Sequence, residues 1–185
     1  MTKEIAENLL TSIIVETNSF RLPATSYFTF KLCSDLAKTG VDFADLTKGV
    51  YWAKTKESAI LSGICLSRCR FLRDSRIAWS LARQRDFRTV KGKDYDIDAV
   101  ASEMCAIEGV EIAVLFREKS KRTLRVSLRS KGRINVAGVA EKYNGGGHSD
   151  IAGCYIPNNK KSMRELLSFA DAALAPGTAD KAGGK

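Results

Sequence analysis

Residues 121–131 alternate between polar and apolar side chains, which is the pattern of a β-strand with one buried face. Basic and hydroxyl side chains such as Arg125 and Arg129 share one parity, whereas leucine and valine side chains such as Val126 share the other. Successive side chains of a strand point to opposite faces of its sheet. The segment therefore predicts a sheet with a cationic outer face, which either binds an anion or keeps the strand in contact with solvent.

Further strand and helix patterns surround this segment. Short apolar runs rich in branched and aromatic residues predict strands. These runs lie at 69–72, 76–82, 110–116 and 153–156. Apolar residues spaced by three or four positions predict helices. These helices lie at about 97–107, 136–143 and 160–174, with Asn135 as the expected cap of the second.

The first third of the chain has helical spacing. Ile5 and Leu9 begin a run of apolar residues at every fourth position. Thr25-Ser26 is expected to cap a second helix that ends near Lys38, and residues 42–67 predict one long or two short helices. The predicted fold class is α+β with α/β-type layers, in which a helical first part precedes a mixed β-sheet domain flanked by helices.

The composition excludes several classes of protein. The sequence has one histidine, His148, which rules out a histidine-rich metal centre, a Cys/His zinc finger and an HExxH protease. No apolar run reaches the ~18–20 residues that a membrane-spanning helix needs. Five cysteines without CxxC spacing, and an acidic residue near the start, favour a reduced cytoplasmic protein without an export signal.

The net charge of +9 favours an anionic partner. Residues 68–93 hold nine basic and two acidic side chains, and residues 117–133 hold eight and one. Guanidinium and hydroxyl groups bind phosphate oxygens, so the second segment, which contains the alternating strand, is a candidate phosphate contact. The first segment is equally compatible with a solvated face.

Residues 144–148, Asn-Gly-Gly-Gly-His, form a candidate anion site. Glycines let backbone N–H groups converge on one point, and we expect a helical turn at 149–152 whose dipole adds to the site. A tight turn is the more common role of three glycines, but a cationic strand end about fifteen residues upstream favours a shared pocket. The candidate binding residues are Arg129, Ser130, Lys131, Asn135, Gly145, Gly146, Gly147 and His148.

Three blocks in the second half of the chain resemble a known family. They are Ser-Leu-Arg-Ser-Lys-Gly at 127–132, Asn-Val-Ala-Gly-Val-Ala at 135–140, and Gly-Gly-Gly-His at 145–148 followed by Ala152-Gly153. In order and spacing they resemble the DHH-associated domain of the DHH phosphoesterases. The closest likeness is to the nano-RNase and pAp-phosphatase branch, which is similar to the cyclic-dinucleotide phosphodiesterases. Asn144 stands where the family usually has a further glycine.

Residues 14–21 resemble the last motif of the DHH domain, in which an aspartate ligates catalytic manganese. Glu16 stands at that position, either as a metal ligand or as an ordinary carboxylate at a helix end. The family's Asp-His-His triplet does not occur in this sequence, and one carboxylate cannot hold two ions. The resemblance thus implies a manganese enzyme whose metal site is incomplete in this chain.

The resemblance also implies a domain organisation. We expect a remnant of the metal-binding DHH domain at 1–54, a linker helix at 55–67, the DHH-associated substrate-binding domain at 68–175 and a disordered tail at 176–185.

The function implied by the resemblance is to hold a short RNA or DNA oligonucleotide, or a phosphorylated nucleotide, whose identity stays open. The chain would present the bound phosphate to a DHH domain in the same or a separate polypeptide, and would be inactive alone. The family resemblance is compatible with a homodimer, and no membrane partner is expected. Two alternatives remain open, namely a non-enzymatic module for single-stranded nucleic acid and a divergent hydrolase that uses Glu16.

Overall fold

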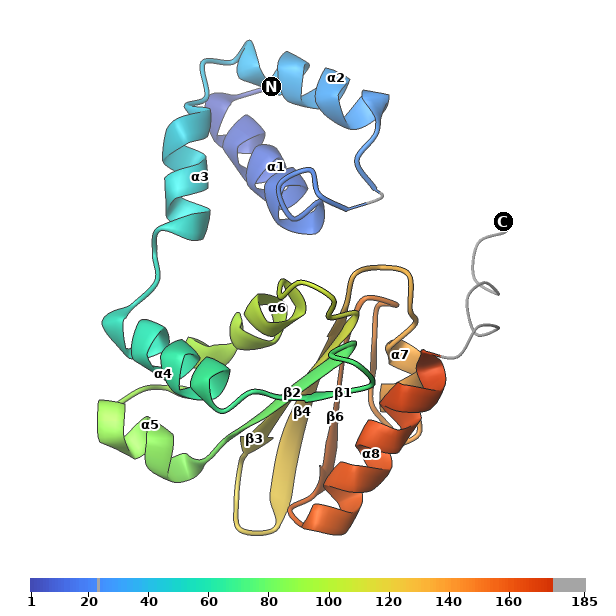
Figure 1. Cartoon of the computed structure of the whole chain (residues 1–185). Helices are drawn as coiled ribbons and strands as arrows, with labels where there is room; N and C mark the ends of the chain where they lie inside the picture. The colour runs from blue at the N-terminus through green and yellow to red at the C-terminus, as the bar shows by residue number, and fades with distance from the viewer. Residues whose placement is uncertain (23, 175–185) are drawn as a thin grey trace. The chain divides into compact units, whose positions relative to one another are not determined.

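The structure, a computed structural model, describes residues 1–22 and 24–174, so the expected tail at 176–185 lies outside the described residues. The chain divides into two compact units, of which the first is Met1–Lys54 and the second begins at Thr55. Figure 1 shows helices in the first unit and helices around a sheet in the second, which confirms the α+β class. None of the helices in the described ranges combines the length and the apolar character that crossing a membrane requires.

Helices whose first turns are capped by side chains build the first unit. They are α1 (Lys3–Glu16), α2 (Tyr27–Ala37) and α3 (Phe43–Tyr51). The caps are Thr2, Ser26 and Asp42, whose side-chain oxygens accept hydrogen bonds from backbone N–H groups of the first turn. A small core holds the unit together, and it contains Ala6, Leu10, Cys33, Leu36 and Val41. The first two predicted helices are therefore confirmed.

The predicted helical stretch at 42–67 consists of two helices that belong to different units. The second of them, α4 (Lys56–Ser67), begins after Thr55, whose hydroxyl accepts a backbone hydrogen bond. It buries Leu61 and Cys65 in a cluster with residues of the sheet. The helix between the two units thus packs as part of the second.

A six-stranded sheet with the order β1-β2-β3-β4-β6-β5 forms the centre of the second unit. The strands β2 and β3 are parallel, and the other neighbouring strands are antiparallel, so the sheet is mixed as predicted. The strands are β1 (Arg70–Leu72), β2 (Ile77–Ala82), β3 (Ile112–Glu118), β4 (Thr123–Ser130), β5 (Gly146–Gly147) and β6 (Ile151–Pro157).

Short helical segments connect the parallel strands β2 and β3. They are α5 (Gln84–Val90), the 3₁₀ helix η1 (Asp94–Ile97) and α6 (Val100–Cys105). The sequence predicts a single helix at about 97–107, where the structure has η1 and α6. It does not predict α5, because Asp86 is the one fully buried residue of that helix and no apolar stripe marks it.

Helices cover the two faces of the sheet unequally. Figure 1 shows α7 (Ala137–Glu141) and α8 (Lys160–Ala173) on one side, where they pack on Val126 and its neighbours. On the other side, α4 and α6 pack on β2 and β3 through residues such as Leu115. Side chains of β4 alternate between buried and partly exposed positions, which confirms the predicted alternation.

Candidate functional site

The side of β4 and β6 that faces away from α7 and α8 combines cationic and apolar side chains, and we call it the open face. Directly opposite residues of antiparallel strands point to the same side of a sheet. The members of the open face are the cross-strand pairs Arg125 with Tyr155, Ser127 with Gly153, and Arg129 with Ile151. The residues from β4 are partly exposed, so they are accessible to a ligand.

Arg129 lies at the carboxyl end of β4, where two hydrogen bonds orient its guanidinium. Its Nε donates to Ser102 Oγ at 3.3 Å, and its Nη1 donates to the Leu128 carbonyl at 3.0 Å. Burial lowers the pKa of Arg129, whereas the carboxylates of Asp150 and Asp98 act in the opposite direction. The ordinary pKa of arginine is so high that the group remains cationic, and its remaining N–H groups can donate to an anion.

Ser130 and Lys131 differ in their position relative to Arg129. Ser130 is buried on the opposite side of β4, and its hydroxyl donates to the Ile134 carbonyl at 2.7 Å. Lys131 is exposed, and its ammonium donates to the Ile107 carbonyl at 3.1 Å. Ser130 therefore shapes the turn after β4, while Lys131 stays accessible at the strand end.

The Asn135 side chain bonds the first turn of α7, although Val136 is the residue that directly precedes the helix. The side-chain carbonyl of Asn135 accepts hydrogen bonds from the backbone N–H groups of Ala137 at 3.0 Å and Gly138 at 3.4 Å. This is the arrangement in which asparagine stabilises a helix start. The Asn135 side chain thus positions the segment that follows β4.

The glycine-rich segment forms a hairpin with β6. Gly146 and Gly147 make up β5 and pair with Gly153 and Ala152. The predicted helical turn at 149–152 is wrong, because β6 begins within this range and takes its backbone into the sheet. The expected contribution of a helix dipole is therefore lost.

Backbone hydrogen bonds fasten the turn of this hairpin to the end of β4. The N–H of Ser130 donates to the Asp150 carbonyl at 2.9 Å, and the N–H of His148 donates to the Ile151 carbonyl at 2.7 Å. The His148 side chain is exposed, and its imidazole makes no hydrogen bond to any residue that the structure describes. The structure thus brings the turn and the strand end together.

The glycines of this turn are constrained differently. A Cβ at Gly145 would lie 2.3 Å from the Gly153 carbonyl oxygen, and one at Gly147, where φ is +147°, would lie 2.2 Å from the Ile151 carbonyl oxygen. No atom lies within 4 Å of the Cβ position at Gly146. Because Gly146 pairs with Gly153, that space adjoins the open face. Packing thus requires the first and third glycines, and the middle one leaves room for a ligand.

Comparison with known families supports a common origin for this arrangement. Residues 89–175 match the DHHA1 domain family. The chain carries a DHHA1 domain. The family resemblance that the sequence blocks indicate is thereby confirmed.

Curated relatives of this chain extend well beyond the region that they share with it. The bifunctional oligoribonuclease and PAP phosphatase NrnA of Thermus thermophilus is 28% identical over 155 residues, which cover 84% of this chain and 46% of the relative. The NrnA of Bacillus subtilis is 26% identical over 170 residues, which cover 91% and 53%. The cyclic-di-AMP phosphodiesterase PdeA of Listeria monocytogenes is 26% identical over 172 residues, which cover 90% and 24%. The chain spans about half the length of the NrnA relatives that it matches.

A solved structure has the same fold. An exopolyphosphatase-related protein from Bacteroides fragilis superimposes with a TM-score of 0.81 at 23% identity. The match covers 94% of this chain and 50% of that chain. The arrangement of helices and strands described above is therefore shared with that protein.

A buried arginine of the DHHA1 domain organises a polar network that the sequence analysis does not identify. The Arg117 side chain is 1% exposed, and its guanidinium donates to the Asp94 carbonyl at 2.7 Å and to the Asp98 carboxylate at 2.6 Å. The Asp94 carboxylate also lies 3.0 Å from Lys119 Nζ and 3.8 Å from Arg125 Nη1. Burial opposes ionisation of Asp94, but hydrogen bonds and charges from Lys119 and Arg117 hold its pKa below the ordinary value. The network fixes η1 beside the open face.

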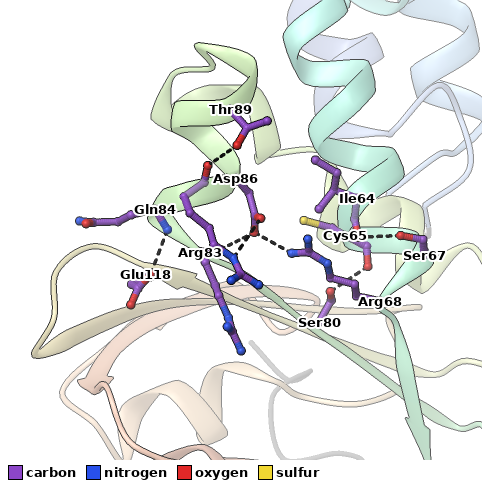
Figure 2. Close-up of polar contacts among 11 residues, drawn as sticks. Ile64, Cys65, Ser67, Arg68, Ser80, Arg83, Gln84, Asp86, Thr89 and Glu118 are labelled. Carbon is purple, nitrogen blue, oxygen red and sulfur yellow. Dashed lines mark hydrogen bonds and ion pairs between the residues drawn. The ribbon is translucent and has the colours of Figure 1, made fainter.

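The basic segment at 68–93 is spread over several elements, and many of its charges are paired. Figure 2 shows Arg68 beside Asp86, with 2.8 Å between Nη1 and Oδ2, and the same carboxylate accepts the Arg83 backbone N–H. Two further pairs are Arg73 with Asp171 and Arg76 with Glu111. These contacts favour a structural and solvated role for the segment.

The described residues do not form a metal centre around Glu16. This glutamate ends α1 and is exposed. Within residues 1–22 and 24–174, no three His, Cys, Asp or Glu side chains lie together in a group that could hold a metal ion. A two-metal centre needs several such ligands around both ions. The described donors therefore do not fit a manganese pair, and we derive no catalytic step through one.

Proposed function

We propose that the open face and the glycine turn together bind the phosphate groups of a short oligonucleotide or a phosphorylated nucleotide. The observation that carries this proposal is the row of partly exposed side chains on β4, in which Arg129 lies at the strand end beside the turn that holds His148 and Arg125 lies farther along the strand. Guanidinium groups donate paired N–H bonds to phosphate oxygens, and the Ser127 hydroxyl between the two arginines can add another.

Each candidate residue has a role in this proposal. Lys131 adds charge at the strand end, and Gly146 lets the ligand approach the backbone. Asn135, Gly145 and Gly147 position the segments that carry the site. Ser130 stabilises the turn after β4 without contacting the ligand, since its side chain is buried on the other side of the strand.

The names of the relatives support the ligand class. NrnA is an oligoribonuclease and PAP phosphatase, and PdeA is a cyclic-di-AMP phosphodiesterase. Each of these names describes a substrate with nucleotide phosphates. We propose that this chain holds a ligand of the same class while a manganese-containing DHH domain, in the same or a separate polypeptide, cleaves the phosphate ester.

The proposal includes three further statements. The chain is inactive without the DHH domain. It acts in the cytoplasm, and two copies of it can associate. The odd number of cysteines and their lack of CxxC spacing favour a reducing compartment.

A binding experiment tests the phosphate site. Calorimetric titration of the chain with adenosine 3′,5′-bisphosphate should give a saturable isotherm, and Arg129→Ala should weaken binding by about 1.5–3 kcal/mol, the magnitude of a charged hydrogen bond. Arg164→Ala is the matched control, because it removes the same charge from an exposed position on α8 on the other side of the sheet. Equal affinities of the parent and the Arg129→Ala variant would overturn the site.

An activity assay tests the need for a second domain. The chain incubated with Mn²⁺ and the same bisphosphate should release no inorganic phosphate. Turnover that Glu16→Gln abolishes would instead support a divergent hydrolase and would overturn this part of the proposal.

A further inference from the structure

Tyr155 is a large exposed aromatic side chain on β6, at a point where this strand pairs with β4 and has passed the end of β5. It is 58% exposed. Within the described part of the chain, its ring stacks on no aromatic or cationic partner and its hydroxyl has no hydrogen-bond partner. By contrast, the exposed ring of Tyr95 is covered by the Lys93 ammonium at 5.6 Å. The Tyr155 ring is therefore free to stack on a ligand.

The neighbours of Tyr155 on the open face suit a nucleotide. Its cross-strand partner is Arg125, so a guanidinium and an aromatic ring stand side by side. The next row along the strands is Ser127, Gly153 and Gly146, which places two residues without side chains beside the ring. A flat base can approach the ring over such a row, because no bulky side chain projects there.

The position of Tyr155 separates it from the part of the proposed site that lies at the strand end, around Arg129 and the glycine turn. Arg125 and Arg129 are four residues apart on β4, which corresponds to about 13 Å along a strand. Tyr155 and Arg125 therefore occupy a row of their own, away from Arg129 and the glycine turn. A ligand that uses both rows must be longer than one that uses the strand end alone.

We propose that Tyr155 and Arg125 form a second nucleotide subsite, in which the ring stacks on a base and the guanidinium contacts the adjacent phosphate. This inference rests on the proposed function, and it adds a preference for ligands with at least two nucleotides. Stacking on an aromatic side chain tolerates any base, so the subsite selects for length and is indifferent to sequence.

Titration of the chain with two ligands tests the subsite. The first is adenosine 3′,5′-bisphosphate, with one base, and the second is the 5′-phosphorylated adenosine dinucleotide, with two. Tyr155→Ala should weaken binding of the dinucleotide about tenfold, the effect of losing one stacked base, and should change binding of the bisphosphate less than twofold. Tyr155→Phe should retain the dinucleotide affinity, because the ring and not the hydroxyl carries the contact.

A matched control and a second readout make the outcome decisive. Phe71→Ala removes another exposed aromatic, on the edge strand β1, and should alter neither affinity. A dinucleotide with 2-aminopurine as its second base should lose fluorescence on binding to the parent and not to Tyr155→Ala. Equal effects of Tyr155→Ala on both ligands, or no effect on either, would overturn the subsite while leaving the phosphate site intact. Failure of the parent to bind the bisphosphate would overturn the proposed function itself.

Discussion

The guanidinium of Arg117 donates to the Asp98 carboxylate at 2.6 Å, and the arginine is buried whereas the aspartate side chain is 55% exposed. Asp94, the other acidic partner of Arg117, is also partly exposed. Removing the carboxylates would leave a buried cation without a charged partner, whereas removing the arginine would leave carboxylates that water can solvate. The cost of breaking a buried ion pair depends on which member stays behind.

We therefore predict that Asp94→Asn with Asp98→Asn destabilises the chain more than Arg117→Met does. The double variant should lower the free energy of unfolding by about 2 kcal/mol or more, the magnitude of lost charged hydrogen bonds. Urea denaturation at neutral pH measures both values. Asp35→Asn, which removes one partner of an exposed ion pair, is the control and should leave stability unchanged. A larger loss from Arg117→Met would contradict this view of the network.

Two glycines of the hairpin turn should respond in opposite ways to substitution. Gly146→Val places its side chain in open space beside the open face, so the variant should fold normally and bind adenosine 3′,5′-bisphosphate at least as weakly as Arg129→Ala. Gly147→Ala forces a Cβ against the Ile151 carbonyl at a backbone conformation that favours glycine. It should cost about 2 kcal/mol of stability, in the range of local backbone strain. Thermal unfolding and titration of both variants separate the effects, and a destabilised Gly146→Val would refute the assignment.

Stability should fall in alkaline solution because of two buried thiols. Burial raises the pKa of Cys154 to about 11, and burial followed by the charge of Asp86 raises that of Cys65 to about 11. Their ordinary value is 9.0, so the unfolded chain releases these protons first and the free energy of unfolding decreases as pH rises from about 9 to 11. Urea denaturation from pH 7 to 11 should show this decline, and it should be shallower in Cys65→Ala with Cys154→Ala. An equal decline of the free energy of unfolding with pH in the parent and the double variant would contradict the role of these two thiols.

The salt dependence of binding distinguishes a short phosphate site from a general nucleic-acid surface. For single strands, the logarithm of affinity falls against the logarithm of salt with a slope of about −0.7 per phosphate contact. A site limited to the open face should give the same shallow slope for a dinucleotide and an octanucleotide. Titrations of both ligands across a range of salt concentrations measure this slope. A steeper slope and a higher affinity for the octanucleotide would favour the non-enzymatic binding module instead.

Much of the fold follows from local patterns of side chains. The parity of residues 123–130 predicts which side of β4 is buried, and the same parity already separates Ser130 from Arg129. The alternation of Ile151, Gly153 and Tyr155 with buried neighbours marks the open face of β6 in the same way. These features need no knowledge of distant contacts.

Other features depend on contacts between distant parts of the chain. The pairing of Gly146 with Gly153 decides that the glycine segment enters a hairpin and does not precede a helix. The role of Arg117 requires knowing that η1 folds onto β3, although an arginine directly after the buried run 112–116 is a signal that could be followed. The excess of basic residues at 68–93 likewise does not reveal that Arg68 forms an ion pair with Asp86.

The two outermost strands of the sheet, β1 and β5, contain three and two residues. Short edge strands are one way in which proteins prevent their sheets from extending into those of neighbouring molecules. Each outermost strand therefore offers only two or three residues of backbone for another chain to join in an intermolecular ladder. Concentrated solutions of this chain should accordingly resist growth of fibrils through its sheet borders.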